Sequence, residues 1–338
     1  HLLRALSARY HVHLGAFVDD PDDRRYEQDV AQYCQSCRLL PLSGAVGRLR
    51  SLSGFLTGEA LSLPYYRDRR MRRWVEEVWE HCPVSRIVVF SSAMAQYATD
   101  RRFGSARRVI DFVDVDSDKW RQYAAAKPAR SAWVFRREGK RLEAYDKAVA
   151  RQFDVSLFVS REEAALFRGL LDDDRVRVEH MLNGVDTAYF SLNPSRESPF
   201  PQGRRAIVFT GAMDYWANVD AVSWFCREVL PTIRGRVLDA VFYIVGIRPT
   251  DAVRRLAGEG VVVTGAVPDV RPYLQHADAV VAPMQIARGI QNKVLEALSM
   301  ERPVVVTTKG LEGIGAVDGE QLLVADQPVE FAAKLRAI

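Results

Sequence analysis

Several features that define common protein classes are missing from this sequence. No stretch of about 18 apolar residues occurs, so the sequence predicts no membrane-spanning helix. The first residues lack the basic, apolar and small-residue order of a secretory signal, and we expect a cytoplasmic protein. No H-E-x-x-H spacing occurs, and no G-x-G-x-x-G follows an expected strand. The sequence therefore argues against a zinc protease and against a dehydrogenase that binds a dinucleotide.

Cysteine is scarce, with four residues in a chain of 338. Cys34 and Cys37 form a single C-x-x-C, which without a second pair or neighbouring histidines cannot supply the four ligands of a structural zinc. We expect reduced thiols at the junction of a helix and a strand. The sequence predicts no metal site.

Charge is nearly balanced, with a formal net charge of +4, but the positive charge is clustered. Two short runs are rich in it: Arg67, Arg69, Arg70, Arg72 and Arg73 form one, and Arg136, Arg137, Lys140 and Arg141 form the other. Such runs are typical of solvated helix faces. The alternative for the first cluster is an amphipathic helix that meets anionic lipid head groups and inserts Trp74, Val75 and Val78 into the interface. No nucleic-acid recognition motif accompanies the charge, so we expect no nucleic-acid partner.

Short apolar runs alternate with helical patterns from end to end, which indicates an α/β protein with parallel sheets covered by helices on both faces. The expected strands of the first half are His11–Phe17, Arg38–Pro41, Arg86–Phe90, Arg108–Val113 and Val155–Val159. Those of the second half are Ala206–Thr210, Val241–Val245, Val261–Thr264, Ala279–Ala282 and Pro303–Thr307. Two doubly wound, Rossmann-like domains follow.

The stretch Leu192–Gly203 is rich in Pro, Ser and Asn, and we interpret it as a linker. The expected domains are residues 1–190 and 204–338, with the boundary near 187–204. Residue 1 reads as the middle of a helix, and Phe331–Ile338 stops inside a helical pattern. We therefore expect that the first strand and its loop are missing and that the chain is trimmed at both ends.

The most informative segment is Pro283–Val306. Read as a helix that begins near Gly289, it places Gly289, Lys293 and Glu296 on one polar stripe beside an apolar one. A helix N-terminus attracts a pyrophosphate, which Lys293 and the preceding Arg288 could neutralise. Glu296 is suited to accept hydrogen bonds from two ribose hydroxyls. The structural alternative is a surface Lys–Glu pair.

This segment, P-x5-G-x3-K-x2-E-A followed by P-V-V-V, resembles the donor-site signature of retaining GT-B glycosyltransferases. Longer runs resemble the sugar transferases found with bacterial PEP-CTERM exosortase and exopolysaccharide systems: DFVDVDSDKW, NGVD, FTGAMDYWANVDAV, RPYL and ARGIQNKVLEAL. The resemblance spans nearly the whole chain.

The resemblance implies a GT-B fold, in which two Rossmann-like domains face a cleft, and transfer of a sugar with retention at the anomeric carbon. The donor would be a UDP- or GDP-linked sugar, with no other cofactor and no metal. A lipid-linked or saccharide acceptor is implied, such as a polyprenyl-linked saccharide, together with peripheral attachment to the inner face of the plasma membrane. Glu296 would hold the ribose, while Lys293 and Arg288 would line the diphosphate. Arg288 stands where the family has its first glutamate, which leaves the sugar open.

Two further loops are expected at the donor site, because ligands of doubly wound sheets bind beyond the carboxyl ends of the strands. Gly211 opens one loop, with Asn218 as the expected cap of the next helix. Gly246 and Arg248 follow the next strand and could approach phosphate. Backbone groups near Val267 could contact the base, as in similar enzymes.

In the first domain a group of polar residues follows a buried strand and is expected on the acceptor side. Its members are Asp111, Asp114, Asp116, Ser117 and Lys119, joined by Ser91 and Ser92 after the neighbouring strand. Asp114 or Asp116 could accept the proton of the attacking hydroxyl. The alternative is a polar turn with Asx capping.

Two other functions stay open at this stage. One is a sugar-nucleotide epimerase or phosphorylase of the same fold, although no persuasive acid/base pair is visible. The other is a non-catalytic subunit that binds a nucleotide sugar, which the substitution at Arg288 permits.

Overall fold

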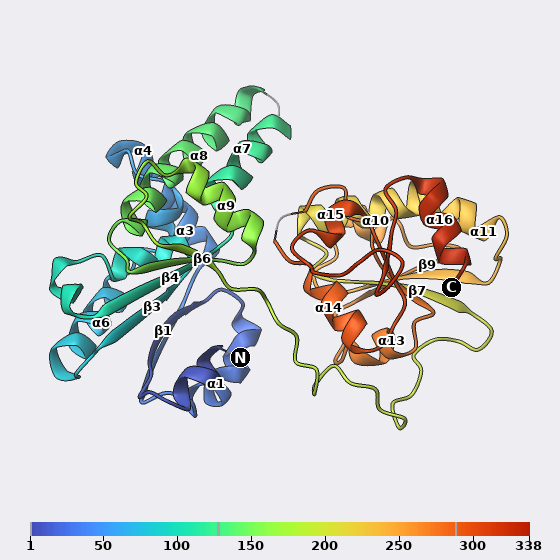
Figure 1. Cartoon of the computed structure of the whole chain (residues 1–338), viewed down its shortest axis with the longest axis horizontal. Coiled ribbons are helices and arrows are strands. Elements are labelled where there is room, and N and C mark those ends of the chain that lie inside the picture. The colour runs from blue at the N-terminus through green and yellow to red at the C-terminus, as the bar shows by residue number, and fades with distance from the viewer. Residues whose placement is uncertain (1, 127–128, 288) are drawn as a thin grey trace. The chain divides into compact units, whose positions relative to one another are not determined.

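The computed structural model describes residues 2–126, 129–287 and 289–338. The chain divides into two compact units, His1–His180 and Met181–Ile338, each built of parallel strands and helices (Figure 1). The division therefore falls between residues 180 and 181, before the boundary near residues 187–204 that was expected from the sequence. Each unit is described by itself below.

The strands of the first unit form two parallel sheets. The smaller pairs β1 (His13–Val18) with β2 (Ser36–Pro41), and the larger has the order β3-β4-β5-β6. The strands of the larger sheet are β3 (Arg86–Phe90), β4 (Arg107–Val113), β5 (Val155–Phe158) and β6 (Val178–His180). The five strands expected from the sequence are confirmed within two residues at each end. β6 was missed because three residues that include Glu179 and His180 have no apolar run.

Helices surround these sheets, and they are short except for α6 and the pair α7 and α8, which lie side by side (Figure 1). The elements are α1 (Leu2–Ser7), η1 (Pro21–Tyr26), α2 (Glu27–Ala31), α3 (Gly44–Ser51), α4 (Ser53–Thr57), α5 (Ser62–Tyr65), α6 (Arg69–His81), η2 (Ser92–Tyr97), η3 (Arg101–Ser105), α7 (Asp116–Ala126), α8 (Ala129–Ala150) and α9 (Arg161–Leu170). The core of the larger sheet contains Phe112, Phe158 and Phe167, whose rings are in mutual contact. This apolar core fixes the strand ends that bear the polar groups described below.

The side chain of Ser160 caps the start of α9. The backbone N–H of Glu163 donates to the Ser160 hydroxyl at 3.1 Å, directly after β5. The Glu163 carboxylate, which is buried, accepts a 2.6 Å hydrogen bond from the N–H of Val115. The cap therefore also ties α9 to the segment that follows β4.

The apolar side of α6 is occupied within the first unit. Met71 is fully buried, and Trp74 and Val75 pack around it against a small cluster that includes Leu40 and Phe17. Trp74 and Val75 are thus packed against the first unit itself. The amphipathic alternative for this segment required them to enter a lipid interface instead. None of the helices in the described part of the chain combines the length and the apolar character needed to cross a bilayer.

Cys34 and Cys37 are free thiols, and burial raises the pKa of Cys37 to about 11.

The second unit contains one sheet of six parallel strands in the order β12-β11-β10-β7-β8-β9. Its strands are β7 (Arg205–Thr210), β8 (Ala240–Val245), β9 (Val261–Gly265), β10 (Ala279–Ala282), β11 (Val304–Val306) and β12 (Leu323–Val324). The five expected strands are confirmed, and the two-residue β12 was missed. The helical elements are α10 (Trp216–Trp224), η4 (Phe225–Val229), α11 (Leu230–Arg234), α12 (Asp251–Arg254), α13 (Arg271–Gln275), α14 (Asn292–Ser299), α15 (Thr308–Leu311) and α16 (Pro328–Arg336).

The stretch interpreted as a linker packs on the second unit. The ring of Phe200 lies 4.5 Å from that of Tyr243 in β8, measured between centroids. The N–H of Asn193 donates to the side chain of Gln275 at 3.0 Å, and His276 lies 2.7 Å from the carbonyl of Arg196. Residues 181–204 therefore belong to the second unit. The segment has no helix or strand, and these aromatic and hydrogen-bond contacts hold it against that unit.

Candidate functional site

The loops after β7 and β8 touch through their backbones at two glycines. A Cβ atom on Gly246 would lie 1.7 Å from the carbonyl oxygen of Gly211, and one on Gly211 would lie 2.7 Å from the Asn218 amide nitrogen. The N–H of Gly211 donates to Val245 at 3.1 Å, and that of Gly246 donates to Gly265 at 3.2 Å. Only glycine fits at these two positions. The carboxyl ends of the two central strands therefore present a surface of backbone without side chains.

Lys293, in the first turn of α14, reaches this surface. Its Nζ lies 3.1 Å from Gln291 Oε1, 3.3 Å from Asn218 Oδ1 and 5.0 Å from the centre of the Phe209 ring. Burial lowers the pKa of Lys293 to about 8, which Glu296 opposes only in part. Among the described residues, no carboxylate lies within ion-pair distance of Nζ. The site thus holds a desolvated cation whose present partners are neutral, an arrangement that an anion would stabilise.

Glu296 follows Lys293 by three residues on the same helix. It is partly buried, and burial raises the pKa of its carboxyl above the usual value, while Lys293 acts in the opposite direction. Lys293 and Glu296 both lie on α14, as the sequence predicts, but they do not form an ion pair. α14 begins at Asn292, however, with Gln291 preceding it in an extended conformation. The predicted start near Gly289 is wrong, because Gly289 has a φ of 67°, which interrupts the helix.

Asn218 was expected to cap the helix that follows β7, and this is wrong. α10 begins at Trp216, so Asn218 lies inside its first turn and is buried. Its amide nitrogen donates to the carbonyl of Ala212 at 2.9 Å, while its amide oxygen faces Lys293. Asn218 therefore fixes the loop that begins at Gly211.

The remaining donor-side residues are placed as follows. Arg248 has a φ of 51° and forms an ion pair of 2.7 Å with Asp214, which ties the loop after β8 to the loop after β7. Val267 follows β9 and packs against the core of the second unit. Arg288 lies outside the described residues. Sequence reasoning missed Gln291 and Phe209, which contact the lysine only because of the tertiary fold.

The acceptor-side residues of the first unit gather at the carboxyl ends of β3 and β4. The Asp111 carboxylate is buried and accepts a 2.9 Å hydrogen bond from the N–H of Val113. Burial raises the pKa of Asp111. Lys119 lies 2.6 Å from Asp114 and 3.1 Å from Asp116, and the two carboxylates raise the pKa of the lysine. Both proposed proton acceptors are therefore already paired with a cation.

Two serines complete this group. Ser117 is fully buried, and its hydroxyl has no partner among the described residues. The Ser92 hydroxyl donates to Asp146 of α8, a buried carboxyl whose pKa burial raises to about 8, and Ser91 has a φ of 76°. Asp146 was missed, because an acidic residue in a helix rich in charge reads as exposed. Within the described residues, no three His, Cys, Asp or Glu side chains are grouped so that they could hold a metal ion.

The chain is similar to a known protein family in part of its sequence and to several solved structures in its fold. The sequence of residues 204–338 matches the model of a family described as glycosyl transferases group 1. No curated protein sequence matches the chain. Among solved structures, the chain is similar to HepE from Anabaena in complex with UDP-glucose (TM-score 0.65, 13% identity, 99% of this chain and 84% of that one).

Two further structures share the same arrangement. Sucrose-phosphate synthase from Thermosynechococcus elongatus has a TM-score of 0.70 at 16% identity, over 100% of this chain and 82% of that one. WaaG, a glycosyltransferase of lipopolysaccharide biosynthesis, has a TM-score of 0.64 at 14% identity, over 99% and 84%. The chain has the GT-B fold. In this GT-B chain, the residues matched by the family model include Gly211, Gly246, Lys293 and Glu296.

The glycine contact gives a first prediction. Gly246→Ala should lower the free energy of unfolding by about 3 kcal/mol, because its Cβ has to displace the backbone of Gly211. Gly258→Ala is the matched control, since no atom lies within 4 Å of the added methyl group. Urea denaturation of the two variants measures the difference. Equal stabilities would contradict the assigned contact.

Proposed function

We propose that this chain is a glycosyltransferase that moves a sugar from a nucleotide-diphosphate donor, UDP- or GDP-linked, to an acceptor. The observation on which the proposal rests is the partly buried Lys293 beside the side-chain-free contact of Gly211 and Gly246. A diphosphate fits such a place, because backbone can approach it closely and the lysine supplies a charge-assisted hydrogen bond. The sequence match of residues 204–338 to a glycosyltransferase family supports this reading.

In the proposed reaction, Lys293 stabilises the charge that develops on the departing diphosphate, and Glu296 accepts hydrogen bonds from the ribose hydroxyls. Transfer with retention is proposed from the resemblance to retaining enzymes. The pairing of Asp114 and Asp116 with Lys119 supports a step in which the acceptor hydroxyl gives its proton to the leaving diphosphate rather than to either carboxylate. The two structures of HepE with UDP and with UDP-glucose support a nucleotide sugar as donor.

The acceptor side of the proposal is a lipid-linked or saccharide acceptor in exopolysaccharide biosynthesis, at the inner face of a bacterial plasma membrane. The resemblance to transferases of PEP-CTERM systems supports it. Because Trp74 and Val75 are packed inside the first unit, the proposed membrane contact is electrostatic and involves exposed arginines of α6 such as Arg69 and Arg73. No metal or further cofactor is proposed.

A non-catalytic subunit that binds a nucleotide sugar is the second candidate, favoured by the engaged carboxylates in the first unit. Incubation with labelled UDP- and GDP-sugars and defined saccharide acceptors separates the two. Labelled product dependent on Lys293 supports the enzyme. Saturable donor binding without product, for every donor and acceptor offered, supports the subunit.

Lys293→Ala should weaken binding of a nucleoside diphosphate by about 2 kcal/mol and leave binding of the parent nucleoside nearly unchanged. The reason is that the contact is made to phosphate alone. Calorimetric titration of both ligands measures the difference. Arg227→Ala, which removes an exposed charge from η4, is the control and should bind both as the parent does. Equal losses for nucleotide and nucleoside would refute the phosphate role.

Glu296→Gln should weaken the nucleoside as well as the nucleotide, by about 1 to 2 kcal/mol, because an amide accepts hydrogen bonds from ribose hydroxyls less strongly than a carboxylate. The matching 2′,3′-dideoxynucleoside should bind the parent and the variant equally. A nucleoside affinity unaffected by the substitution would show that Glu296 does not hold the ribose.

Binding of the nucleoside diphosphate should depend on pH through Lys293. Below pH 8 the lysine is charged in the free protein, so affinity changes little. Above pH 8 the free lysine is neutral and must take up a proton on binding, so affinity should fall roughly tenfold per pH unit. Titrations between pH 7 and 10 measure this. The Lys293→Ala variant should lose the dependence, and its persistence there would assign it to another group.

A further inference from the structure

A polar cavity lies in the first unit, among the helices beside the larger sheet. Its volume is about 540 Å³, within the range of small-ligand pockets. Its lining includes Glu59 before α5, Arg67, Arg72 of α6, Gln96 of η2, and Arg141 and Tyr145 of α8. None of these residues belongs to the donor-side or acceptor-side groups described above.

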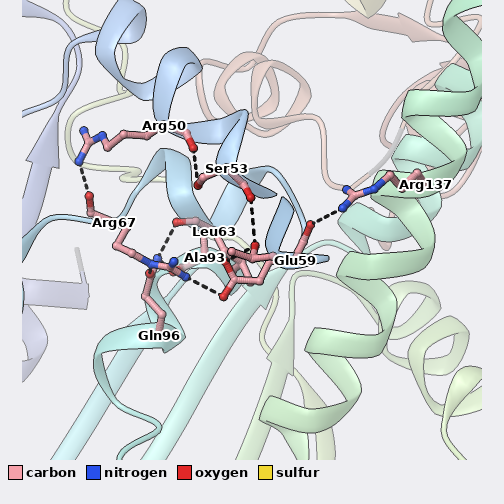
Figure 2. Close-up of polar contacts among 9 residues, drawn as sticks. Arg50, Ser53, Glu59, Leu63, Arg67, Ala93, Gln96 and Arg137 are labelled. Carbon is pink, nitrogen blue, oxygen red and sulfur yellow. Dashed lines mark hydrogen bonds and ion pairs between the residues drawn. The ribbon is translucent and has the colours of Figure 1, made fainter. Parts of the chain in front are cut away.

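The wall of this cavity is held in place by hydrogen bonds. Arg67 lies 3.0 Å from Glu59 and 3.2 Å from Gln96, whose amide nitrogen donates to the carbonyls of Leu63 and Ala93 at 3.1 and 2.7 Å (Figure 2). The segment before α5 is in turn fixed by Arg137, which donates to the carbonyl of Glu59 at 3.1 Å. Arg67 is thereby fixed in one orientation, so a ligand need not order it.

Both acidic residues of the cavity are already engaged. Glu59 pairs with Arg67, which holds the pKa of its carboxyl below the usual value. Asp100 accepts hydrogen bonds from the backbone and the guanidinium of Arg102, and its pKa is also lowered. Arg72 and Arg141 have no carboxylate within ion-pair distance among the described residues. The cavity therefore has an uncompensated positive charge.

Two residues of α8 that line this cavity, Arg141 and Tyr145, carry hydrogen-bond donors. The Arg141 guanidinium lies 3.9 Å from where a Cβ on Gly58 would be, so it extends across the cavity wall from α8. Tyr145, one turn further along the same face of α8, has a buried hydroxyl with no hydrogen-bond partner in the described residues. Burial of a hydroxyl without a partner is unfavourable, and an acceptor oxygen from a ligand would remove that cost.

We propose that this cavity is a binding site for a phosphate group of a small phosphorylated ligand or lipid head group, separate from the donor site. Arg72 and Arg141 supply the charge, Tyr145 donates to one oxygen, and Arg67 forms a preorganised wall. Phosphate fits better than a carboxylate, because three or four oxygens can accept from donors on three different elements at once. The proposal does not depend on glycosyl transfer.

The test is calorimetric titration of the whole chain with pyrophosphate, with Lys293→Ala removing the donor-side contribution. In that background, Arg72→Gln with Arg141→Gln should weaken binding roughly 100-fold. Arg48→Gln with Arg161→Gln is the matched control, since it removes the same charge from exposed positions of α3 and α9 outside the cavity lining. Tyr145→Phe should weaken binding several-fold without lowering the melting temperature, because it removes an unsatisfied hydroxyl.

Three outcomes overturn the proposal: unchanged pyrophosphate and vesicle binding in the Arg72 and Arg141 variant, equal losses in the Arg48 and Arg161 control, or citrate binding as tight as that of pyrophosphate. A parallel arm uses phosphatidylglycerol vesicles. Vesicle binding that needs Arg72 and Arg141 but not Arg48 and Arg161, without binding of soluble pyrophosphate, identifies a lipid head group as the source of the phosphate. A loss caused by Lys293→Ala alone concerns only the donor site.

Discussion

The backbone contact between Gly211 and Gly246 is the constraint on which the donor-side geometry depends. The sheet order places β7 and β8 side by side, so the loops that follow them emerge at the same edge. Without side chains at the two glycines, these loops can touch, and the Asn218 side chain closes against the first of them. Lys293 from α14 then lies beside Asn218 and the Phe209 ring. A larger residue at either glycine would separate the loops and displace the lysine's neighbours.

The strands and the general place of the site could be predicted from the sequence, because buried parallel strands have continuous apolar runs and ligands bind at their carboxyl ends. Lys293 and Glu296 were singled out from their helical spacing together with the resemblance to glycosyltransferases. The start of α14 was not, since nothing in the spacing shows that Gly289 has a φ of 67°. Asn218 was misread for a similar reason: its hydrogen bond to Ala212 replaces the capping bond that its residue type predicts.

The first unit shows a different limit of sequence reasoning. The grouping of Asp111, Asp114 and Asp116 after a strand was visible, but their partners were not. The two candidate bases, Asp114 and Asp116, both form ion pairs with Lys119. Asp146 is buried against Ser92, which lies 54 residues away along the chain. Whether a carboxylate is left without an ion-pair partner depends on contacts between different helices and strands, and the spacing of residues along the sequence does not reveal these contacts. Phe200 is a further example, because one aromatic ring suffices to hold a segment that reads as a linker.

The two proposed anion sites differ in the environment of their cationic side chains. Burial lowers the pKa of Lys293 from 10.5 to about 8, which corresponds to a cost of about 3 kcal/mol for keeping the lysine charged without an anion. A diphosphate that replaces the lost solvation recovers that cost, so affinity at this site is coupled to protonation. Arg72 and Arg141 are exposed, so binding at the cavity in the first unit should respond to ionic strength instead. Proton linkage and salt dependence therefore separate the two sites in one protein.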